Sequence, residues 1–516
     1  MPTSASRSLH EYREALAPCL VASGGIIDGV AVTGATADSR AVTPGFIFCA
    51  IRGAVLDGHD FIAQALAAGA AALVVEKKPL SLPSGLPWFQ VRDGYHAAAL
   101  VAEVAAGRPA GGLSLAAVTG TNGKTTSAYL LRALFRAGGC HPGMIGTVEY
   151  DLGDGRPVPA DRTTPTPFQL QHLFTRLRQA GARPVVIEVS SHALAQKRLG
   201  TAHCQAALFT NLTRDHLDYH HDFEQYYLAK KSLFTDVCCR DALRVVNLDD
   251  SYGQRLAREL AADGLDTIGF ASSPGPHAQV TVSDIRSTAD GSDFTLTFNA
   301  DAKKSLPDLR LHTPLPGLYN VANAAGAAIM AISWGIDQSA VAAALADCRG
   351  APGRLQMIPA HRAPFRVFVD YAHTDDALTN VLAALRRLEP SRLIVVFGCG
   401  GDRDRSKRPL MAQAAAKAAD LVMVTSDNPR TEDPEDIIRQ ILAGIPAGTA
   451  CQAVTDRREA IRLALNAACP GAIVLIAGKG HEDYQEVNGV KHPFNDAEIA
   501  AEILRRLETE RPAGRP

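Results

Sequence analysis

The chain has 516 residues, nearly half of them apolar and about a fifth charged, and its formal net charge at pH 7 is −2. This composition is typical of a globular protein with several domains, and the small net charge gives no electrostatic footprint for nucleic acid or an acidic membrane surface. Ten cysteines form no C-x-x-C pair and have no metal-site spacing, so we expect reduced thiols.

The N-terminal 25 residues lack the basic-then-apolar layout of a signal peptide. The most apolar long run, 62–75, is too short to span a bilayer. We therefore expect a cytoplasmic protein without membrane insertion. Residues 25–105 alternate short strand-like and helical pieces, which predicts a small α/β unit, and the segment 108–112 has the composition of a linker into the next domain.

The sequence TGTNGKTT at 119–126 lies between an apolar run, 113–118, that predicts a buried strand and a helical pattern at 127–137. Backbone N–H groups and the helix dipole then point at one anion, as in a phosphate-binding loop. Lys124 is expected to reach the terminal phosphates and the Thr125 hydroxyl to bind Mg²⁺. The loop is shorter than the standard phosphate-loop pattern, because Val118 stands where that pattern has its first glycine. We predict that the chain binds ATP or a similar nucleotide.

Two further strands end in polar residues. The apolar run 184–188 ends in Glu188, which at this position can hold Mg²⁺ directly or through water, although a lone glutamate at a strand end is as often structural. The strand predicted at 206–210 leads into 215–221, which contains three histidines and two aspartates. Such a cluster suits a metal or substrate site, whereas any one histidine alone does not imply one.

Three features precede the last domain. Two adjacent lysines on the helix predicted at 223–234 are expected to face solvent. Alternating apolar residues at 280–298 predict a hairpin. Asn320 and Asn323 lie near the start of the next helix, where either could cap it or reach a base edge, and we expect capping for either one alone.

Beyond a second linker at 349–354, strands and helices alternate to about residue 507, which predicts a mostly parallel, doubly wound sheet and then a frayed tail. Polar motifs follow four strands, and we expect them to converge because ligands bind at the carboxyl ends of such strands. Arginines with acids suit a zwitterionic ligand, since Arg grips carboxylate and Asp or Glu receives ammonium. The motifs are DYAH at 370–373, GCGGDRDR at 398–405, SDNPR at 426–430 and GKGHE at 478–482.

Together, the motifs TGTNGKTT, EVSSH, TNLTRDHLD, DYAHT and GKGHE resemble those of the Mur ligases, ATP-dependent amino-acid-adding enzymes of bacterial cell-wall synthesis. The likeness extends in order over about residues 36–507. It implies an α/β protein of three domains, with Mg²⁺ as cofactor, ATP as co-substrate and, we expect, a monomeric state. The three domains would be an N-terminal UDP-binding domain (1–108), a central P-loop ATPase domain (109–348) and a C-terminal Rossmann-like domain that brings the amino acid (349–516).

Within that family, DNPR at 427–430 resembles the signature of members that add meso-2,6-diaminopimelate to UDP-N-acetylmuramoyl-L-alanyl-D-glutamate, and lysine-adding relatives lack this arginine. The resemblance implies amide formation at the D-Glu side-chain carboxylate through an acyl phosphate, with domain closure, in peptidoglycan precursor synthesis. The alternatives are an L-lysine-adding ligase, a folylpolyglutamate synthase, a phosphate-loop kinase and a non-catalytic nucleotide-binding protein.

The resemblance also assigns residues by motif, with Lys230 matching the family's carbamylated lysine, whose carbamate would be an oxygen ligand for Mg²⁺. The catalytic set is Lys124, Glu188, His216 and Lys230, and the metal set is Thr125, Glu188, His216 and Lys230. The ATP set is Gly120, Thr121, Asn122, Gly123, Lys124, Thr125, Thr126, Asn320, Arg354 and Asp370. The set for the UDP-muramoyl-dipeptide is Ser39, Thr163, Thr164, Ser190, Gln196 and Arg198. The diaminopimelate set is Arg403, Asp427, Asn428, Pro429, Arg430, Gly478 and Glu482.

Four residues depart from the family pattern. Arg162 stands where an asparagine is common, at a contact to the sugar or diphosphate. Gln356 replaces a glutamate, Asp375 a proline and Ser406 a glycine. None of the four removes a group that the chemistry requires.

Overall fold

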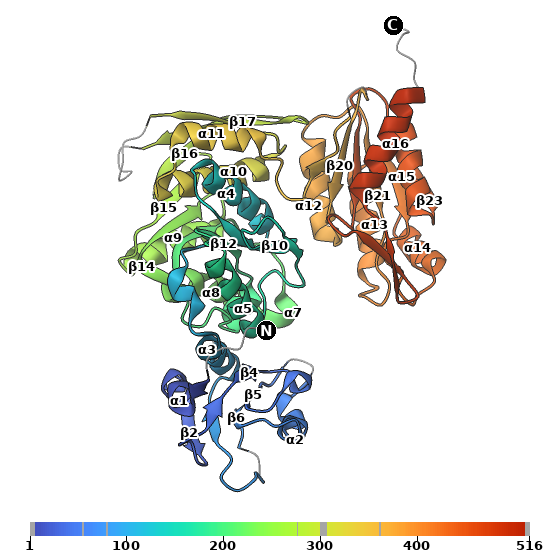
Figure 1. Ribbon diagram of the computed structural model, residues 1–516. Helices are drawn as coiled ribbons and strands as arrows, with labels where there is room; N and C mark the ends of the chain where they lie inside the picture. Colours follow the sequence, from blue (N-terminus) through green and yellow to red (C-terminus); the bar gives the residue numbers. More distant parts are fainter. Residues whose placement is uncertain are drawn as a thin grey trace. The chain divides into compact units, whose positions relative to one another are not determined.

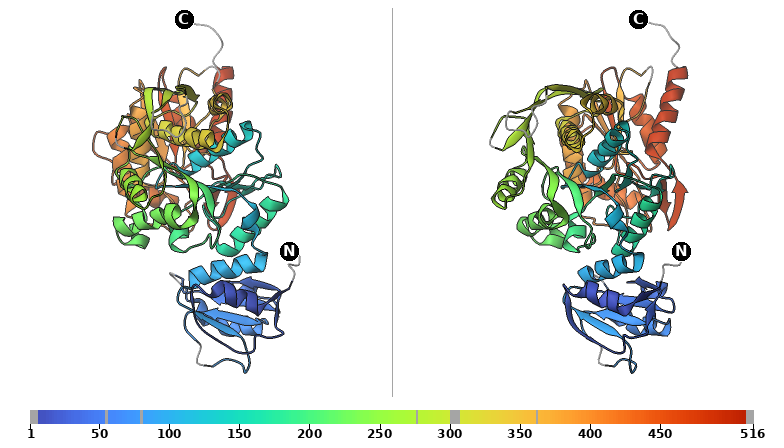
Figure 2. Two further views of the ribbon diagram at one scale, coloured as in Figure 1. Left: turned by 90° about the vertical axis from the view of Figure 1, so that its left-hand side faces the viewer. Right: turned by 60° about the vertical axis from the view of Figure 1, so that its left-hand side comes forward.

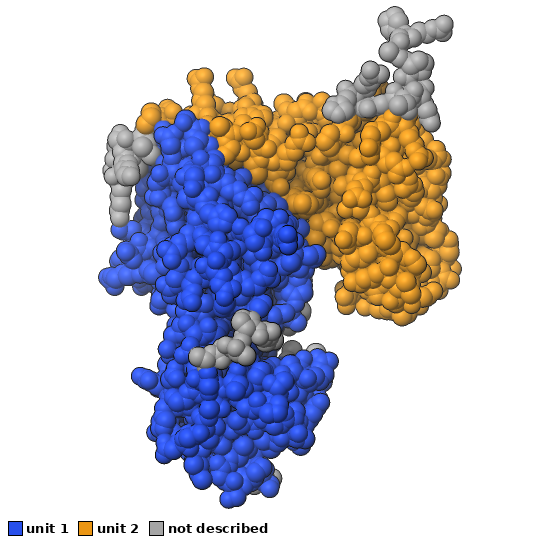
Figure 3. All heavy atoms as spheres, in the orientation of Figure 1, with its two compact units in different colours: residues 1–281, 298–305, 326–341 blue, residues 282–297, 306–325, 342–516 orange. Residues whose placement is uncertain are grey.

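The computed structural model describes residues 6–53, 56–78, 81–275, 277–299, 307–360 and 363–510. The chain divides into two compact units (Figure 3). Unit 1 comprises residues 1–281, 298–305 and 326–341, and unit 2 comprises residues 282–297, 306–325 and 342–516. This division passes through β16 (Ala278–Thr288) and α10 (Leu318–Trp334), so the three domain boundaries stay predictions.

Unit 1 begins with a five-stranded sheet of order β2-β7-β6-β5-β4 (Figure 1), the small α/β unit expected from the sequence. Side chains alternate between its two faces, because successive residues of a strand point in opposite directions. Ile47 and Val74 pack with α1 and α3, whereas Phe48 and Leu73 pack with α2. The elements are β2 (Leu20–Gly24), β4 (Gly34–Thr36), β5 (Phe46–Ala50), β6 (Ala72–Val75), β7 (Trp88–Val91), α1 (Leu9–Leu16), α2 (Ile62–Ala67) and α3 (Gly94–Ala106), with β1 (Arg7–Ser8) paired to β3 (Ala31–Val32).

A second sheet of eleven strands follows, in the order β11-β10-β9-β12-β8-β13-β14-β15-β16-β17-β18. β8 pairs in parallel with both β12 and β13, so the carboxyl ends of these three strands lie at one edge. The hairpin expected at 280–298 is confirmed as the neighbours β16 and β17. The strands are β8 (Leu115–Thr119), β9 (Gly143–Ile145), β10 (Glu149–Asp151), β11 (Val158–Pro159), β12 (Val185–Glu188), β13 (Cys204–Phe209), β14 (Cys238–Asn247), β15 (Ile268–Ala271), β17 (Gly291–Phe298) and β18 (Leu309–Thr313).

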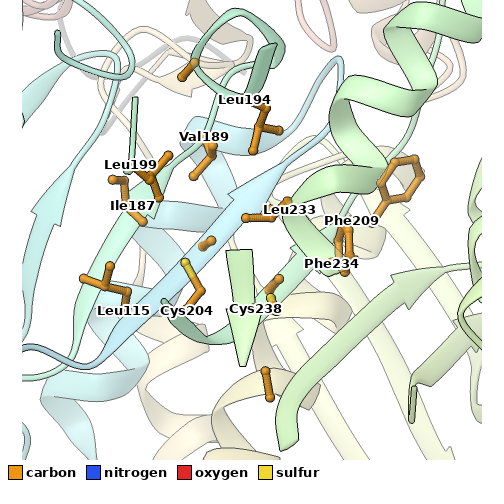
Figure 4. Close-up of a cluster of buried hydrophobic side chains, with 14 of the residues drawn as sticks. Leu115, Ile187, Val189, Leu194, Leu199, Cys204, Phe209, Leu233, Phe234 and Cys238 are labelled. Carbon is orange, nitrogen blue, oxygen red and sulfur yellow. The ribbon is translucent and has the colours of Figure 1, made fainter. Parts of the chain in front are cut away.

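Nearly all side chains of the three central strands are buried. Figure 4 shows apolar side chains of these strands gathered with Leu233 and Phe234, and all belong to one core. Burial of each such side chain is worth about 1.5–3 kcal/mol. Figure 2 shows α3 between the N-terminal sheet and this second sheet, where it packs on α5. The helices are α4 (Lys124–Ala137), α5 (Pro167–Gln179), α6 (Ser191–Ala195), α7 (Leu217–His220), α8 (Phe223–Ser232), α9 (Ser251–Ala262) and α11 (Gln338–Asp347).

Unit 2 contains a six-stranded sheet of order β19-β20-β24-β21-β22-β23, in which only β19 is antiparallel. α12, α13 and α14 cover one face, and α15 and α16 cover the other. The expected doubly wound sheet is therefore confirmed. Its elements are β19 (Gln356–Met357), β20 (Arg366–Asp370), β21 (Leu393–Phe397), β22 (Leu421–Thr425), β23 (Cys451–Val454), β24 (Ile473–Ala477), α12 (Asp375–Arg386), α13 (Lys407–Ala418), α14 (Pro434–Leu442), α15 (Arg457–Asn466) and α16 (Asp496–Glu510). The hairpin β25 (Tyr484–Val487) and β26 (Val490–Pro493) lies in the chain between β24 and α16.

Some boundaries differ from the sequence-based prediction. The helix expected at 223–234 ends at Ser232 and continues as a π-helical turn, Leu233–Val237. The last helix extends to Glu510, two residues into the expected frayed tail, and 511–516 lie outside the described residues. None of the described helices is long and apolar enough to cross a bilayer.

We predict that Gly253→Ala lowers the midpoint of thermal unfolding although alanine favours helices. A Cβ at Gly253, inside α9, would lie 1.9 Å from the backbone oxygen of Asn247. Overpacking of this kind costs about 1–3 kcal/mol, more than the roughly 1 kcal/mol gained in helix propensity.

The matched control is Gly111→Ala, because a Cβ at Gly111 would meet no described atom within 4 Å. Unfolding midpoints of both variants should be measured by calorimetry. A Gly253→Ala protein as stable as the control would contradict the packing described here.

Candidate functional site

The phosphate loop joins β8 to α4. Gly120 has φ +152°, and a Cβ there would lie 1.9 Å from the Thr210 hydroxyl oxygen, so the loop requires glycine at this position. No side chain caps the start of α4, as is common where a helix N-terminus binds an anion. Lys124 Nζ lies 2.8 Å from the carbonyl oxygens of both Gly120 and Thr121, so its ammonium group folds back over the loop.

Lys230 is buried, which makes the expected solvent-facing lysine pair wrong for this residue. Its Nζ donates to the Gly120 carbonyl at 2.8 Å, the same oxygen that accepts from Lys124. Burial lowers the pKa of Lys230 well below its ordinary value, and the charge of Lys124 adds to this effect while Asp215 opposes it. This shift raises the fraction of the neutral, nucleophilic amine at Lys230. By contrast, Lys231 forms an ion pair with Glu259 at 3.0 Å.

Glu188 ends β12 with its carboxylate fully buried beside the loop. One carboxylate oxygen accepts from the Thr147 backbone N–H at 2.9 Å. The other accepts from the hydroxyls of Thr125 and Thr147, each at 2.9 Å. Two of the four expected metal ligands, Thr125 and Glu188, are thus in direct contact, and hydroxyl and carboxylate oxygens are ligands that Mg²⁺ prefers.

His216, another expected metal ligand, has φ +53°, which is uncommon outside glycine and is often found at functional sites. Its ring packs against His192, with centroids 4.8 Å apart, and against Tyr226 at 6.2 Å. Among the described residues no group of three or more His, Cys, Asp or Glu side chains could hold a metal. The fit to Mg²⁺ therefore rests on Thr125 and Glu188, with Lys230 as a third ligand only after modification.

Tyr226 connects these groups and was missed by the sequence analysis. Its hydroxyl is 3.0 Å from the Thr121 hydroxyl, and its ring centroid lies 4.7 Å from Lys230 Nζ. The signal in the sequence was the spacing, because residues four apart share a helix face. Thr147, which holds Glu188, was missed as well, and nothing in the local sequence marked it.

Five of the six residues expected to bind the UDP-muramoyl-dipeptide are joined by hydrogen bonds around Glu188. The Thr164 hydroxyl donates to the Glu188 carbonyl at 2.8 Å and accepts from the Ser190 N–H at 3.0 Å. Arg198 donates to the Thr164 carbonyl at 2.5 Å and to the Gln196 side chain at 2.9 Å.

Thr163 is the fifth residue of this network, whereas Ser39 lies elsewhere in the fold. The Thr163 hydroxyl lies 3.0 Å from that of Thr147, which links it to the same network. Ser39 lies in the region of the N-terminal sheet, and its hydroxyl donates to Gln64 of the same region at 2.9 Å.

Burial lowers the pKa of Arg198, and the nearby charge of Arg162 adds to the shift. Two guanidinium charges that act on one another in this way suit an anionic ligand.

The four polar loops of unit 2 converge, as expected. The Gly401 N–H donates to the Asn428 carbonyl at 2.9 Å, and the Gly478 N–H donates to the Asp370 carbonyl at 3.1 Å. Asn428, which is buried, donates from its side chain to Glu482 at 2.8 Å.

Arg430 and Gly478 complete the contacts between these loops. Arg430 has φ +53° and donates to the Gly401 carbonyl at 2.6 Å. Gly478 has φ +115°, and a Cβ there would lie 2.6 Å from the Asp427 carboxylate. Pro429 is buried in the same loop, whereas Arg403 is exposed and no hydrogen bond ties it to the described residues of this cluster.

Lys479 is fully buried in the same cluster and was not among the expected site residues. Its Nζ donates to the Asn428 side-chain oxygen at 2.9 Å and lies 3.4 Å from Glu482 and 3.9 Å from Asp427. The lysine thus offsets the charge of two neighbouring carboxylates. Its place within the GKGHE motif was the available signal.

Three residues expected to serve the nucleotide belong to unit 2, whereas the phosphate loop belongs to unit 1. Asn320 donates to the Pro316 carbonyl at 2.9 Å, so its amide does not cap the helix N–H groups as expected. The Asp370 carboxylate accepts from the Leu355 N–H at 2.6 Å, and burial raises the pKa of Asp370 although Arg354 opposes the shift.

The four departures from the family pattern are locally accommodated. Gln356 accepts from the Gly353 N–H at 2.8 Å, and the Ser406 hydroxyl donates to Asp404 at 2.6 Å. Asp375 is the first residue of α12, where a negative charge complements the helix dipole. The Arg162 carbonyl accepts from the Tyr150 hydroxyl at 2.8 Å, a contact that involves the backbone of Arg162 and not its guanidinium group.

Comparisons with known proteins match three family models: Mur ligase family, catalytic domain (residues 31–91), Mur ligase middle domain (118–331) and Mur ligase, glutamate ligase domain (353–480). A protein of Solibacter usitatus named UDP-N-acetylmuramoyl-L-alanyl-D-glutamate–2,6-diaminopimelate ligase is 44% identical over 92% of this chain and 94% of its own. One of the same name from Geobacter metallireducens is 40% identical over 93% and 95%.

Solved structures agree with these relatives. A structure of a ligase with that same name has a TM-score of 0.68 at 33% identity and covers 98% of this chain and 99% of its own. A MurF structure from Acinetobacter baumannii, at 18% identity, has a TM-score of 0.59 over 98% and 100% and supports the fold alone.

We predict that Tyr226→Phe weakens binding of an ATP analogue and lowers thermal stability, because the Thr121 hydroxyl loses one of its hydrogen-bond partners beside the loop and keeps those to the Thr213 backbone. The loss should be about 0.5–1.5 kcal/mol, as for a typical hydrogen bond. Calorimetric titration and thermal unfolding would measure it.

Tyr129→Phe is the matched control, since the buried Tyr129 hydroxyl makes no hydrogen bond to the phosphate loop in the part of the chain that the structure describes. Its removal should leave both quantities unchanged or raise stability. Equal losses in the two variants would contradict a specific role for the Tyr226 hydroxyl.

Proposed function

The chain belongs to the Mur ligase family, and we propose that it joins meso-2,6-diaminopimelate to the D-Glu side-chain carboxylate of UDP-N-acetylmuramoyl-L-alanyl-D-glutamate, with ATP converted to ADP and phosphate. The observation that carries the choice of amino acid is the contact between the loops on which Asp427, Glu482 and Arg430 lie. The named relatives at 40–44% identity support the same reaction in peptidoglycan precursor synthesis.

The amino-acid site is proposed to read both charges of the substrate's distal centre. Arg430 offers a guanidinium group that matches a carboxylate, while Asp427 and Glu482 offer oxygens for an ammonium group. L-Lysine has the ammonium group but no distal carboxylate, so it would leave the guanidinium with its protein partners alone, the Gly401 carbonyl and Glu486. A site built to bind a charged group discriminates against an analogue that lacks it, which favours diaminopimelate over L-lysine.

The first chemical step activates a carboxylate, which is otherwise a poor electrophile because its leaving group would be oxide. The D-Glu carboxylate oxygen attacks the γ-phosphorus of ATP, the bond from that phosphorus to the bridging oxygen breaks, and ADP leaves. Lys124 is proposed to hold the transferred group and offset its negative charge. Mg²⁺ bound beside Thr125 and Glu188 would supply further positive charge at these phosphates.

The second step forms the amide. The uncharged amine of diaminopimelate attacks the acyl-phosphate carbon, and the tetrahedral intermediate expels phosphate as the amine loses a proton. Thr164, Ser190 and Arg198 are proposed to fix the dipeptide, and their mutual hydrogen bonds support a preorganised surface.

Lys230 is proposed to carry a carbamate, formed when its neutral amine attacks CO₂ and releases a proton. Its lowered pKa supports this reaction, because the protonated amine is not a nucleophile.

The use of ATP and a UDP-linked precursor favours the cytoplasm as the compartment of the protein. We also propose that the protein is a monomer.

The experiment that tests the function is an incubation with ATP, Mg²⁺ and UDP-N-acetylmuramoyl-L-alanyl-D-glutamate, to which meso-diaminopimelate or L-lysine is added in parallel. We expect phosphate and a tripeptide product only with diaminopimelate, and no turnover by Lys124→Ala. Turnover with L-lysine instead would refute the proposed specificity, and a stable phosphorylated product without an amide would indicate a kinase.

We predict that Arg430→Ala raises the KM for diaminopimelate far more than the KM for ATP. Truncation of one partner of a buried charge pair commonly costs about 2–5 kcal/mol, and the partly buried Arg430 should lie toward the lower end. Steady-state kinetics with each substrate varied in turn would measure both constants.

Arg439→Ala is the control, because Arg439 is an exposed arginine of α14 that pairs with Asp436 at the surface. Such a pair contributes little. If Arg430→Ala raised both KM values equally, the placement of Arg430 in the amino-acid site would be wrong.

A further inference from the structure

A buried ion pair that the proposed reaction does not use lies directly behind the amino-acid loops. Arg457 is the first residue of α15 and Asp496 is the first residue of α16. Arg457 Nε and Nη2 donate to the two carboxylate oxygens of Asp496 at 2.8 and 2.7 Å, and both side chains have no exposed surface. The bidentate contact fixes the plane of the guanidinium group.

The remaining donors of Arg457 bind two backbone carbonyls at the carboxyl edge of the sheet. Nη2 donates to the Ala477 carbonyl at 3.0 Å, and Nη1 to that of Ser426 at 3.4 Å. Ala477 ends β24 and Ser426 follows β22, while β21 lies between these two strands. No strand pairing joins the two carbonyls, so the guanidinium group bridges them.

Each of these carbonyls immediately precedes one of the amino-acid loops. Ser426 leads into Asp427–Arg430, and Ala477 leads into 478–482. The two loops fit closely, since the Asn428 amide donates to Glu482 at 2.8 Å and the Asp427 carboxylate leaves no room for a Cβ at Gly478. A change in their spacing of about 1 Å would misplace the groups that bind substrate, and such errors cost up to roughly hundredfold in rate.

Stability alone does not account for the pair. A buried ion pair is often no more stabilising than two apolar side chains of similar volume. The buried part of the packing between α15 and α16 includes apolar side chains, with Ala464, Ile499 and Ile503 in one core. What an apolar pair lacks is the ability to bind the carbonyls of Ser426 and Ala477.

We propose that Arg457, oriented by Asp496, is a positioning residue for the amino-acid substrate that sets the spacing between the Asp427–Arg430 loop and the 478–482 loop. This inference rests on the proposed function, because it takes the two loops to form the diaminopimelate site. Arg457 itself touches no substrate. Its effect should therefore appear in the KM for the amino acid and leave the nucleotide unaffected.

The test is the double variant Arg457→Met/Asp496→Leu, which removes both charges together and leaves neither buried without a partner. We expect an unfolding midpoint close to that of the wild type, a KM for diaminopimelate raised about ten- to hundredfold, and a KM for ATP unchanged within about twofold.

The matched control is Arg458→Met/Glu502→Leu, an ion pair of 2.6 Å between the same two helices whose side chains are partly exposed. It should leave all three quantities unchanged. If Arg457→Met/Asp496→Leu folds and keeps the wild-type KM for diaminopimelate, the proposal is overturned.

Should the double variant fail to fold, Asp496→Asn decides the question, because asparagine keeps the shape of aspartate but loses one acceptor of the bidentate contact. A raised KM for diaminopimelate supports the proposal and a wild-type KM overturns it. The wild-type measurement separates the proposed function from the positioning role of Arg457. If the wild-type protein does not use diaminopimelate, the proposed function is refuted, while the contacts of Arg457 with the two loops stand.

Discussion

A carboxylate without solvent exposure must be satisfied by hydrogen bonds or by a cation, because removal of a charge from water is costly. Glu188 meets this condition at the end of β12, where Thr125 and Thr147 supply three hydrogen bonds. The parallel register pairs Glu188 with Val118, just before the phosphate loop. The carboxylate is thereby fixed beside the loop, and the Glu188 carbonyl in turn orders Thr164. The positions of Thr125, Thr147 and Thr164 thus depend on hydrogen bonds to Glu188 at the end of β12.

The two units carry different chemistry. Unit 1 has the phosphate loop with two lysine amines that share the Gly120 carbonyl, next to hard oxygen donors. Unit 2 has acids and guanidinium groups on four loops, with Lys479 buried between two carboxylates. The first arrangement suits phosphates and a metal, and the second suits a zwitterion. This separation fits a reaction in which a carboxylate is activated by ATP and an amino acid supplies the nucleophile.

Features with local causes could be predicted from the sequence. The phosphate loop follows from glycines between a strand and a helix, and the doubly wound sheet follows from the alternation of strands and helices. The burial of Lys230 could not be predicted, because it depends on α8 packing against a loop 110 residues earlier in the chain. The same holds for Arg457 and Asp496, whose contact joins two helices far apart in sequence. The roles of the site residues, including Ser39 and Arg403, stay predictions.

The most direct test of the account is the effect of Mg²⁺ on ATP binding by the wild type and by Glu188→Gln, measured by calorimetric titration. If the buried carboxylate serves a metal–nucleotide site, Mg²⁺ should strengthen ATP binding by the wild type, and most of that gain should disappear in Glu188→Gln while metal-free ATP binding stays the same. An equal gain in both proteins would contradict the account, because the carboxylate would then be a structural hydrogen-bond acceptor only.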